Sequence, residues 1–311
     1  MTKPDVLLIG DYPDWDMAGL TESFTCHTDA PEALAAEAAS KIRAVAFKGH
    51  SLFTPALMDL LPNLGLIANF GVGYDVIDVA EASRRNIKVT NTPDVLTDDV
   101  ADLALGMMLA ATRRLLPADA WVRSGDWSAK GNFPLQRTFT GKRVGVMGLG
   151  RIGKAIAERL VAFKSDIHYH SRAPKDVPDA WTYHADPVAM AGAVDYLVVS
   201  LSGGPETAGM VTKEVIAALG PEGTLVNVSR GSTVDEEALI TALQSGALGF
   251  AALDVFAEEP DCDPRFAGLE NTLLQPHQAS GTVETRQAMG VLQRDNMKAF
   301  YAGTPLLTQV N

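Results

Sequence analysis

The sequence is poor in cysteine and has no long apolar run. Only two cysteines occur in 311 residues, Cys26 and Cys262, and they stand in neither a metal-binding nor a redox spacing. A disulfide framework is therefore not expected, and no metal site is predicted. The short apolar run after Asp5 lacks the length and the basic flank of a signal peptide, and no other run is long enough to span a bilayer. We therefore predict a cytoplasmic protein.

Positive charge is also scarce. Lysine and arginine number 26 against 38 aspartates and glutamates, which gives a formal net charge of −12. Such a surface repels phosphate backbones and anionic lipids, so neither nucleic acid nor membrane is an expected partner. An anionic substrate or cofactor would then need a basic pocket of its own.

The length and the apolar pattern indicate two α/β domains. Hydrophobic residues make up 47% of the chain, and 311 residues are more than a domain with a single hydrophobic core usually contains. Apolar strand-like runs alternate with helical stretches, which predicts parallel sheets covered on both faces. The predicted strands are 6–9, 44–47, 66–70, 87–90, 143–147, 167–169, 196–200, 224–227 and 249–253. The predicted helices are 31–42, 97–116, 154–163 and 282–302, and the stretch 124–140 is predicted to be a surface arm.

The strand at 143–147 leads into a glycine-rich turn. Residues 148–153 read GLGRIG and match G-x-G-x-x-G between an apolar strand and a helix. In a dinucleotide site the first glycine permits a tight turn, the second lets a pyrophosphate approach the backbone, and the third lets the helix pack on the strand. The helix N-terminus adds N–H donors. The residues predicted to hold the cofactor here are Gly148, Leu149, Gly150, Arg151, Ile152 and Gly153.

The end of the next strand favours NADPH over NADH. A site for NAD usually has an acidic residue about 20 residues after the glycines, where it accepts from a ribose hydroxyl. Here Ser171 and Arg172 follow the strand and Lys175 comes soon after, with no acid at the tip. A hydroxyl and two cations suit a 2′-phosphate, although an ordinary solvated loop would show the same residues. We predict NADPH as the preferred cofactor, with NADH as the alternative.

Three later loops each carry a residue suited to ketone reduction. Arg230, Glu259 and His277 follow successive strands, and loops at the carboxyl ends of parallel strands line the ligand crevice of such a fold. A histidine can give the proton that quenches the developing alkoxide, and a carboxylate on its other ring nitrogen orients it. An arginine can hold a substrate carboxylate bidentately. The trio predicts a reductase of 2-oxo acids.

Together these segments resemble the D-isomer-specific 2-hydroxyacid dehydrogenases along nearly the whole chain. The resemblance is closest to the glyoxylate/hydroxypyruvate and hydroxyphenylpyruvate reductases. It rests on GVGYD (71–75), VTNTPDVLTDDVADLALG (89–106), GKRVGVMGLGRIG (141–153), NVSRGSTVDEEAL (227–239), ALDVFAEEP (252–260) and PHQASGTVET (276–285).

The resemblance implies roles for individual residues. Arg230, Glu259 and His277 would be catalytic, and Glu259 is preferred to Glu258 because the family's acid directly precedes the proline. Asp254 would contact the nicotinamide carboxamide, and Val228 would lie along the cofactor. Backbone N–H groups after the third strand would bind the substrate carboxylate. The implied substrate contacts are Val72, Gly73, Arg230 and His277.

The family also implies a domain arrangement and an assembly. A flavodoxin-like substrate-binding domain would comprise residues 1–97 and 283–311, with a Rossmann cofactor domain, 98–282, inserted into it. A homodimer built largely through the cofactor domain is expected. Within the arm, Trp127 would either reach toward a neighbouring site or be simply a buried aromatic residue, and we favour the second.

The expected reaction is NADPH-dependent reduction of a small 2-oxo acid to a D-2-hydroxy acid. Lys48, His50 and Leu52 follow a strand of the first domain and are candidates for lining the pocket, although Lys48 would serve equally as a solvated loop residue. Glyoxylate and hydroxypyruvate are the first choice of substrate, and an aromatic pyruvate such as hydroxyphenylpyruvate is the second. A nicotinamide-sensing, corepressor-like scaffold without turnover is the rival of another class, against which the lack of low-complexity segments argues.

Overall fold

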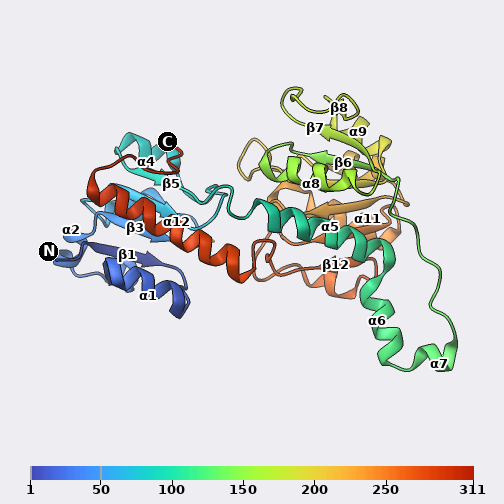
Figure 1. Ribbon diagram of the computed structural model, residues 1–311, viewed down its shortest axis with the longest axis horizontal. Helices are drawn as coiled ribbons and strands as arrows, with labels where there is room; N and C mark the ends of the chain where they lie inside the picture. Colours follow the sequence, from blue (N-terminus) through green and yellow to red (C-terminus); the bar gives the residue numbers. More distant parts are fainter. Residues whose placement is uncertain (1, 50) are drawn as a thin grey trace. The chain divides into compact units, whose positions relative to one another are not determined.

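The computed structural model describes residues 2–49 and 51–311. The chain divides into two compact units, one formed by the residues up to Leu96 together with Thr282–Asn311, and the other by Thr97–Gly281. Each unit is a parallel sheet with helices on both faces (Figure 1). The predicted fold class, two doubly wound α/β domains, is confirmed. The boundaries expected from the sequence differ from these by one residue, and which unit binds which ligand stays a prediction.

The sheet of the first unit has five parallel strands in the order β2-β1-β3-β4-β5, which is the flavodoxin-like order. Val6 and Leu8 of β1 lie in one apolar cluster with Leu20, whereas Leu7 lies in the opposite cluster with Val45. Because both faces are buried, the central strands are continuous apolar runs in the sequence. The strands are β1 (Asp5–Ile9), β2 (Thr25–His27), β3 (Ala44–Phe47), β4 (Leu66–Asn69) and β5 (Lys88–Thr90).

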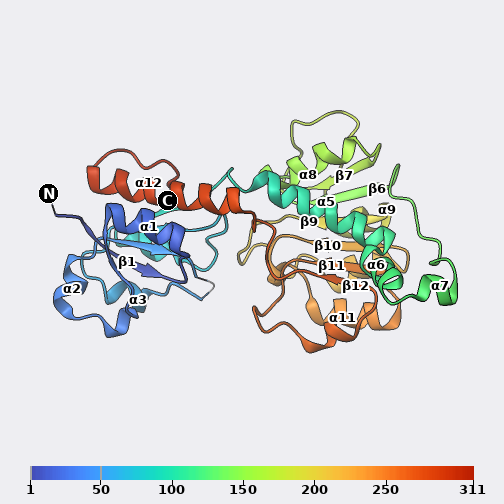
Figure 2. The ribbon, with the colours of Figure 1, turned by 60° about the horizontal axis from the view of Figure 1, so that its bottom comes forward.

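Helices from both ends of the chain cover the first sheet. The C-terminal helix α12 (Val283–Ala302) lies beside α1 (Asp14–Ser23) on one face, as Figures 1 and 2 show. Thr282 caps α12, since its side chain accepts from the N–H of Thr285. The last segment of the chain therefore completes the core of the first unit. The helices of the opposite face are α2 (Ala36–Lys41), α3 (Pro55–Asp59) and α4 (Val79–Arg84).

The sheet of the second unit has seven parallel strands in the order β12-β11-β10-β9-β6-β7-β8. The order reverses direction between β6 and β9, and in a doubly wound sheet ligands bind beyond the carboxyl ends of the strands at such a point. This is the Rossmann arrangement with one additional strand. The strands are β6 (Arg143–Met147), β7 (Asp166–His170), β8 (Thr182–His184), β9 (Tyr196–Val199), β10 (Thr224–Asn227), β11 (Phe250–Leu253) and β12 (Thr272–Leu274).

The helices of the second unit form two layers. One layer contains α5 (Thr97–Arg113) and α8 (Arg151–Val161), which pack on each other. The other contains α9 (Pro187–Ala193), α10 (Lys213–Leu219) and α11 (Glu236–Ser245), with short 3₁₀ turns η2 (Gly231–Thr233) and η3 (Pro264–Gly268) in the loops. Across residues 2–49 and 51–311, no helix is both long enough and apolar enough to cross a membrane.

The helix predicted at 97–116 is in fact two helices. It is interrupted at Arg114, which is left-handed with φ of 50°, and α6 (Leu115–Arg123) then begins. Pro117 explains the break, because in a continuous helix its ring would clash with the carbonyl of Arg113 and its missing N–H would leave that carbonyl without a partner. After the restart Pro117 stands in the first turn of α6, where no N–H bond within the helix is required.

The helix predicted at 31–42 is also interrupted. A 3₁₀ turn, η1 (Pro31–Ala33), is followed by Leu34 and Ala35 in extended conformation and only then by α2. Short alanine-rich helices are marginal by themselves. The extended Leu34 packs against the apolar cluster of the first sheet that contains Leu7 and Val45. Partial burial of this side chain therefore overrides the helix propensity of its neighbours.

The arm between α5 and β6 contains a further short helix, α7 (Asp126–Lys130). The tryptophan of the arm that is packed is Trp121. Its ring meets Phe133 edge-on, with 5.7 Å between the ring centroids, and its Nε1 donates to the carbonyl of Gly131 at 3.0 Å. Trp127 is instead 58% exposed. Our expectation that Trp127 is buried is wrong, because neither α6 nor α7 contains a buried residue that would build a core around it.

Candidate active site

The structure brings two of the three predicted catalytic residues into direct contact. Glu259 follows β11 and His277 follows β12, the neighbouring strand, and Nδ1 of the imidazole lies 2.6 Å from Oε2 of the carboxylate. Both side chains are partly buried, with exposures of 21% for Glu259 and 31% for His277. Glu258 is exposed, so the geometry agrees with the preference for Glu259. This pairing orients the ring, and it leaves Nε2 as the nitrogen from which a proton can be given.

The histidine loop is held by Asp254, which is only 1% exposed. Its two carboxylate oxygens accept from the N–H groups of Gln278 at 2.8 Å and Ala279 at 3.0 Å, and its carbonyl accepts from His277 N at 2.8 Å. Burial raises the pKa of the Asp254 carboxyl, and the two backbone bonds partly oppose that rise. His277 has φ of 49°, a conformation that costs free energy in a residue other than glycine. The bonds to Asp254 therefore maintain a strained backbone at His277, a role that we did not predict.

Arg230 stands on the loop after β10, held by a buried asparagine. Asn227 is 1% exposed, its Nδ2 donates to the carbonyl of Arg230 at 3.0 Å, and its Oδ1 accepts from Ser229 N at 3.0 Å. The guanidinium Nη1 of Arg230 donates to the carbonyl of Ser229 at 2.9 Å. Val228, predicted to lie along the cofactor, is 8% exposed and donates its N–H to Val199 at 3.2 Å. Sequence reasoning missed Asn227, whose only signal was an amide side chain at the end of a buried strand.

The glycine-rich turn between β6 and α8 is shaped by close packing. Gly148 has φ of 99°, and a Cβ on Gly153 would lie 2.0 Å from the carbonyl oxygen of Gly148, so the protein's own atoms require glycine at both positions. A Cβ on Gly150 would meet no atom within 4 Å. Glycine at 150 therefore suits the approach of a ligand, and α8 begins directly after it, with its N-terminal N–H groups at this turn. These features fit a dinucleotide.

The residues at the tip of β7 differ in accessibility. Arg172 and Lys175 are exposed, and Arg172 Nη1 lies 3.7 Å from Glu206 Oε2 in a pair whose side chains are 96% and 84% exposed. Such an exposed pair contributes little free energy, so an incoming phosphate could displace it. Ser171 is buried, and its hydroxyl donates to the carbonyl of Ala173 at 2.7 Å. The two cations are thus available to an anionic ligand, whereas the hydroxyl already has an acceptor.

In the first unit, the predicted carboxylate-binding turn follows β4. Nδ2 of Asn69 donates to the carbonyls of Gly71 at 3.0 Å and Gly73 at 2.9 Å, and Asn91 Nδ2 donates to the carbonyl of Val72 at 2.9 Å. Among residues 2–49 and 51–311, the N–H groups of Val72 and Gly73 donate to no backbone carbonyl. Two amides hold the turn through its carbonyls, which leaves these N–H groups as donors for an anion.

The residues proposed for the pocket wall have different surroundings. Lys48 Nζ donates to the carbonyl of Asp11 at 2.7 Å and stands over the rings of Tyr12 and Phe70, at 5.4 and 5.0 Å from their centroids. Burial, assisted by the charge of Arg286, lowers the pKa of the Lys48 ammonium. Lys48 is therefore a packed residue rather than a freely solvated one. Leu52 is 65% exposed, and His50 lies outside the described residues.

The described residues contain no group of three or more histidine, cysteine, aspartate or glutamate side chains that could hold a metal ion. The arrangement is instead suited to proton transfer. An oriented imidazole, an arginine on an adjacent loop and a turn built for phosphates lie at the carboxyl ends of strands of one sheet. This combination can bind a dinucleotide and an acid and can protonate a developing alkoxide.

Comparison with known proteins agrees with this chemistry. Residues 105–279 match the family described as D-isomer specific 2-hydroxyacid dehydrogenase, NAD binding domain. Hydroxyphenylpyruvate reductase of Plectranthus scutellarioides is 48% identical over 272 residues, which cover 88% of this chain and 86% of that protein.

Two crystal structures extend the similarity to the complete fold. A 2-hydroxyacid dehydrogenase from Ketogulonicigenium vulgare Y25 has a TM-score of 0.94 and 52% identity, covering 100% of this chain and 99% of that one. An NADPH-dependent glyoxylate/hydroxypyruvate reductase from Sinorhizobium meliloti, solved with NADP and malonate, has a TM-score of 0.94 and 43% identity, covering 99% and 97%.

Proposed function

Because the chain belongs to the D-isomer specific 2-hydroxyacid dehydrogenase family, we propose that it uses NADPH to reduce small 2-oxo acids to D-2-hydroxy acids. Glyoxylate and hydroxypyruvate are the proposed substrates, as named for the Sinorhizobium meliloti enzyme. The observation that carries the proposal is the 2.6 Å contact between Glu259 and His277 beside the loop of Arg230. It supplies an oriented proton donor where a 2-oxo acid would be held.

The proposed roles follow from the chemistry of the groups. His277 gives a proton from Nε2 to the substrate oxygen, while Glu259 keeps the ring in place through Nδ1. Arg230 binds the substrate carboxylate in a bidentate manner and polarises the 2-oxo group. The N–H groups of Val72 and Gly73 remain proposed contacts of the substrate. A nicotinamide cofactor supplies the hydride.

The cofactor would be held by the glycine-rich turn and by the tip of β7. Residues Gly148 to Gly153 accommodate the pyrophosphate at the N-terminus of α8. Arg172 and Lys175 bind the 2′-phosphate that distinguishes NADPH from NADH. Asp254 and Val228 remain the proposed contacts of the nicotinamide half.

Replacing Arg172 with alanine should raise the Michaelis constant for NADPH roughly tenfold, the effect of losing one exposed charge-assisted bond to phosphate. The Michaelis constant for NADH should change less than twofold by the same reasoning, because NADH has no 2′-phosphate. Steady-state kinetics with both cofactors measures this difference. The matched control is Arg123→Ala on α6, an exposed arginine that also pairs with a carboxylate, Asp119, and lies outside the glycine-rich turn; it should change neither Michaelis constant. Equal effects of Arg172→Ala on both cofactors would refute the assignment of the 2′-phosphate site.

Substrate choice is tested by NADPH oxidation, followed by absorbance, with glyoxylate, hydroxypyruvate and hydroxyphenylpyruvate. The highest kcat/KM is expected with glyoxylate or hydroxypyruvate. Preference for the aromatic substrate would instead favour the alternative that the 48% identity to a hydroxyphenylpyruvate reductase supports. Tight NADPH binding without turnover of any 2-oxo acid would indicate a nicotinamide-sensing scaffold.

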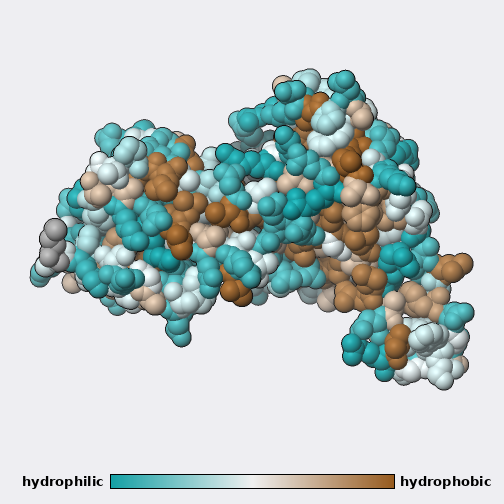
Figure 3. Space-filling model, viewed as in Figure 1, coloured by the Kyte–Doolittle hydropathy of each residue, from teal (hydrophilic) through white to brown (hydrophobic). Residues whose placement is uncertain are grey.

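The proposed assembly is a homodimer that buries the arm. Large apolar side chains of the arm and of its base are between 52% and 100% exposed, and Figure 3 shows brown side chains along this part of the second unit. A second copy of the chain would cover such a surface. The exposed Trp127 then lies where it can reach toward a neighbouring subunit. The exposed apolar residues are Leu115, Leu116, Val122, Trp127 and Leu135.

Introducing charge into this surface should separate the subunits. The double variant Leu116→Glu and Leu135→Glu is expected to run as a monomer by light scattering at a concentration where the natural protein is a dimer. Val161→Glu is the control, since Val161 is 56% exposed on α8, outside the arm. A natural protein that is monomeric at all concentrations tested would eliminate the proposed dimer.

A cytoplasmic location is also part of the proposal. Cys26 and Cys262 are unpaired in the structure, and free thiols are usual in reducing compartments. Fractionation of the source cells, with NADPH-dependent activity as the marker, tests it.

A further inference from the structure

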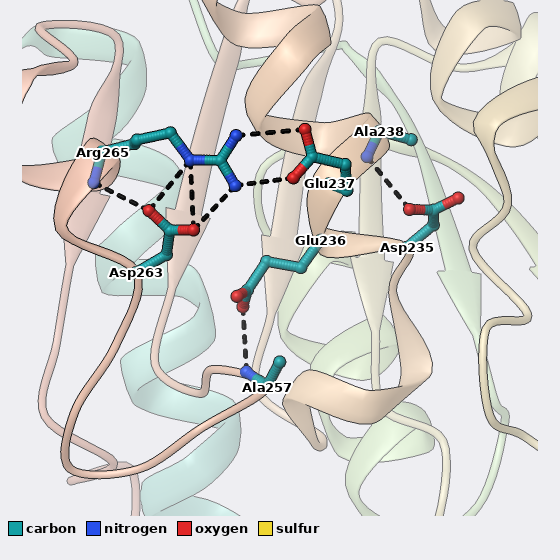
Figure 4. Close-up of polar contacts among 7 residues, drawn as sticks. All are labelled: Asp235, Glu236, Glu237, Ala238, Ala257, Asp263 and Arg265. Carbon is teal, nitrogen blue, oxygen red and sulfur yellow. Dashed lines mark hydrogen bonds and ion pairs between the residues drawn. The ribbon is translucent and has the colours of Figure 1, made fainter.

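The loop that carries Glu259 is held by a glutamate from another element. Glu236 is the first residue of α11, and its Oε2 accepts from the N–H of Ala257 at 2.9 Å, as Figure 4 shows. The preceding N–H, that of Phe256, is bound at 2.9 Å by Oε1 of Glu259 itself. Two successive N–H groups of this loop are thus bound by two glutamates, one outside the loop and one inside it.

The peptide unit between Phe256 and Ala257 is packed against the loop that carries Arg230. A Cβ on Gly231 would lie 1.8 Å from the carbonyl carbon of Phe256 and 2.3 Å from the nitrogen of Ala257. Only glycine allows this approach, and Gly231 directly follows Arg230. The peptide between Phe256 and Ala257 is therefore fixed on one side by the backbone after Arg230 and at its N–H by Glu236.

The position of this peptide determines where the catalytic carboxylate lies. Glu259 uses one oxygen to bind Phe256 N and the other to bind His277 Nδ1 at 2.6 Å. The N–H of Phe256 lies in the preceding peptide, which shares the Cα of Phe256 with the Phe256–Ala257 peptide. If the Phe256–Ala257 peptide moves, Phe256 moves with it, and the carboxylate bound to its N–H no longer holds the imidazole in place. Contacts of this kind affect the rate through geometry, because a reacting group displaced by a fraction of an ångström is poorly aligned.

We propose that Glu236 is a positioning residue for the Glu259–His277 pair. It does not touch the reacting atoms; it holds the Phe256–Ala257 peptide so that the carboxylate of Glu259 keeps the imidazole in its productive orientation. This inference rests on the roles proposed above for Glu259 and His277.

The adjacent residue, Glu237, provides a matched comparison. Both glutamates stand in the first turn of α11, which Asp235 caps through the N–H of Ala238, so both interact with the same helix N-terminus. Glu237, however, pairs with Arg265 in η3, with N–O distances of 3.0 and 2.6 Å. These hydrogen bonds lower the pKa of the Glu237 carboxyl. Glu237 thus anchors a segment beyond the catalytic loop.

The test compares Glu236→Ala, Glu236→Gln and Glu237→Ala in the full-length enzyme. Glu236→Ala should lower kcat roughly tenfold, because the Phe256–Ala257 peptide is displaced, with the dissociation constant for NADPH unchanged. Glu236→Gln keeps an oxygen acceptor for Ala257 N–H and should retain most of the activity. Glu237→Ala should leave kcat near that of the natural enzyme. Hydrogen exchange should speed up in the peptide containing Ala257 in Glu236→Ala alone.

Each outcome decides the proposal. Equal kcat values for Glu236→Ala and Glu237→Ala, or an equal loss in Glu236→Gln and Glu236→Ala, would overturn it. If Glu236→Ala does not fold, Glu236→Asp replaces it, because a carboxylate shortened by about 1.5 Å keeps its charge and no longer reaches Ala257. A His277→Gln enzyme with near-normal turnover would instead refute the proposed role of His277 as proton donor, so the two failures are distinguishable.

Discussion

Replacing His277 with glutamine is expected to lower kcat by about 10²- to 10⁴-fold, the usual contribution of a general acid. Glutamine preserves a polar side chain of similar reach but has no proton to give at neutral pH. The N–H of residue 277 still donates to the carbonyl of Asp254, so the loop is retained. Affinity for NADPH, measured by fluorescence titration, should remain unchanged, and stopped-flow reduction of glyoxylate measures the chemical step.

His27 provides the control for this substitution. It is also a histidine paired with a carboxylate, with Nε2 at 2.7 Å from Asp5 Oδ1, but it lies on the edge strand β2 of the first unit. His27→Gln should leave kcat within twofold of the natural value, since loss of an ordinary ion pair changes stability only slightly. A His277→Gln enzyme with near-normal turnover would eliminate His277 as the proton donor.

Replacing Arg230 with lysine is expected to lower kcat/KM by about 10²- to 10³-fold, the effect of removing one donor that stabilises developing charge. The ammonium keeps the positive charge but lacks the planar fork that binds a carboxylate bidentately. Most of the loss should appear in KM if the arginine acts only on the carboxylate, and in kcat if it also polarises the 2-oxo group. Steady-state kinetics with glyoxylate separates these contributions.

Arg143→Lys is the matched control. Arg143 also forms a fork with a carboxylate, with Nη2 at 2.9 Å and Nε at 3.3 Å from the oxygens of Asp195, but it begins β6 at the amino end of the sheet. Its substitution should not alter kcat/KM. If Arg143→Lys and Arg230→Lys reduced activity equally, the effect would be one of general stability and not of substrate binding.

Much of the fold could be predicted because its central strands are buried on both faces. The runs at 44–47 and 224–227 coincide with β3 and β10, since a strand covered by helices on both sides is apolar at its central positions. The glycine-rich turn could also be predicted from the sequence, because packing at Gly148 and Gly153 allows no residue type other than glycine. The edge strands β2, β8 and β12, each of three residues, were not predicted. A short edge strand is defined by its pairing with a distant neighbour and has little local pattern.

The sequence by itself therefore determined the two sheets, the glycine-rich turn, and the candidate catalytic residues Arg230, Glu259 and His277. Local burial and chemical function restrict which residue types can stand at these positions. Only the tertiary structure decided where the helix after Thr97 stops, and that Asp254, Asn227 and Glu236 hold the three loops. The physical reason is the same in each case. These outcomes depend on contacts between residues that are distant in the chain or on the geometry of a loop, and neither leaves a periodic signal in the sequence.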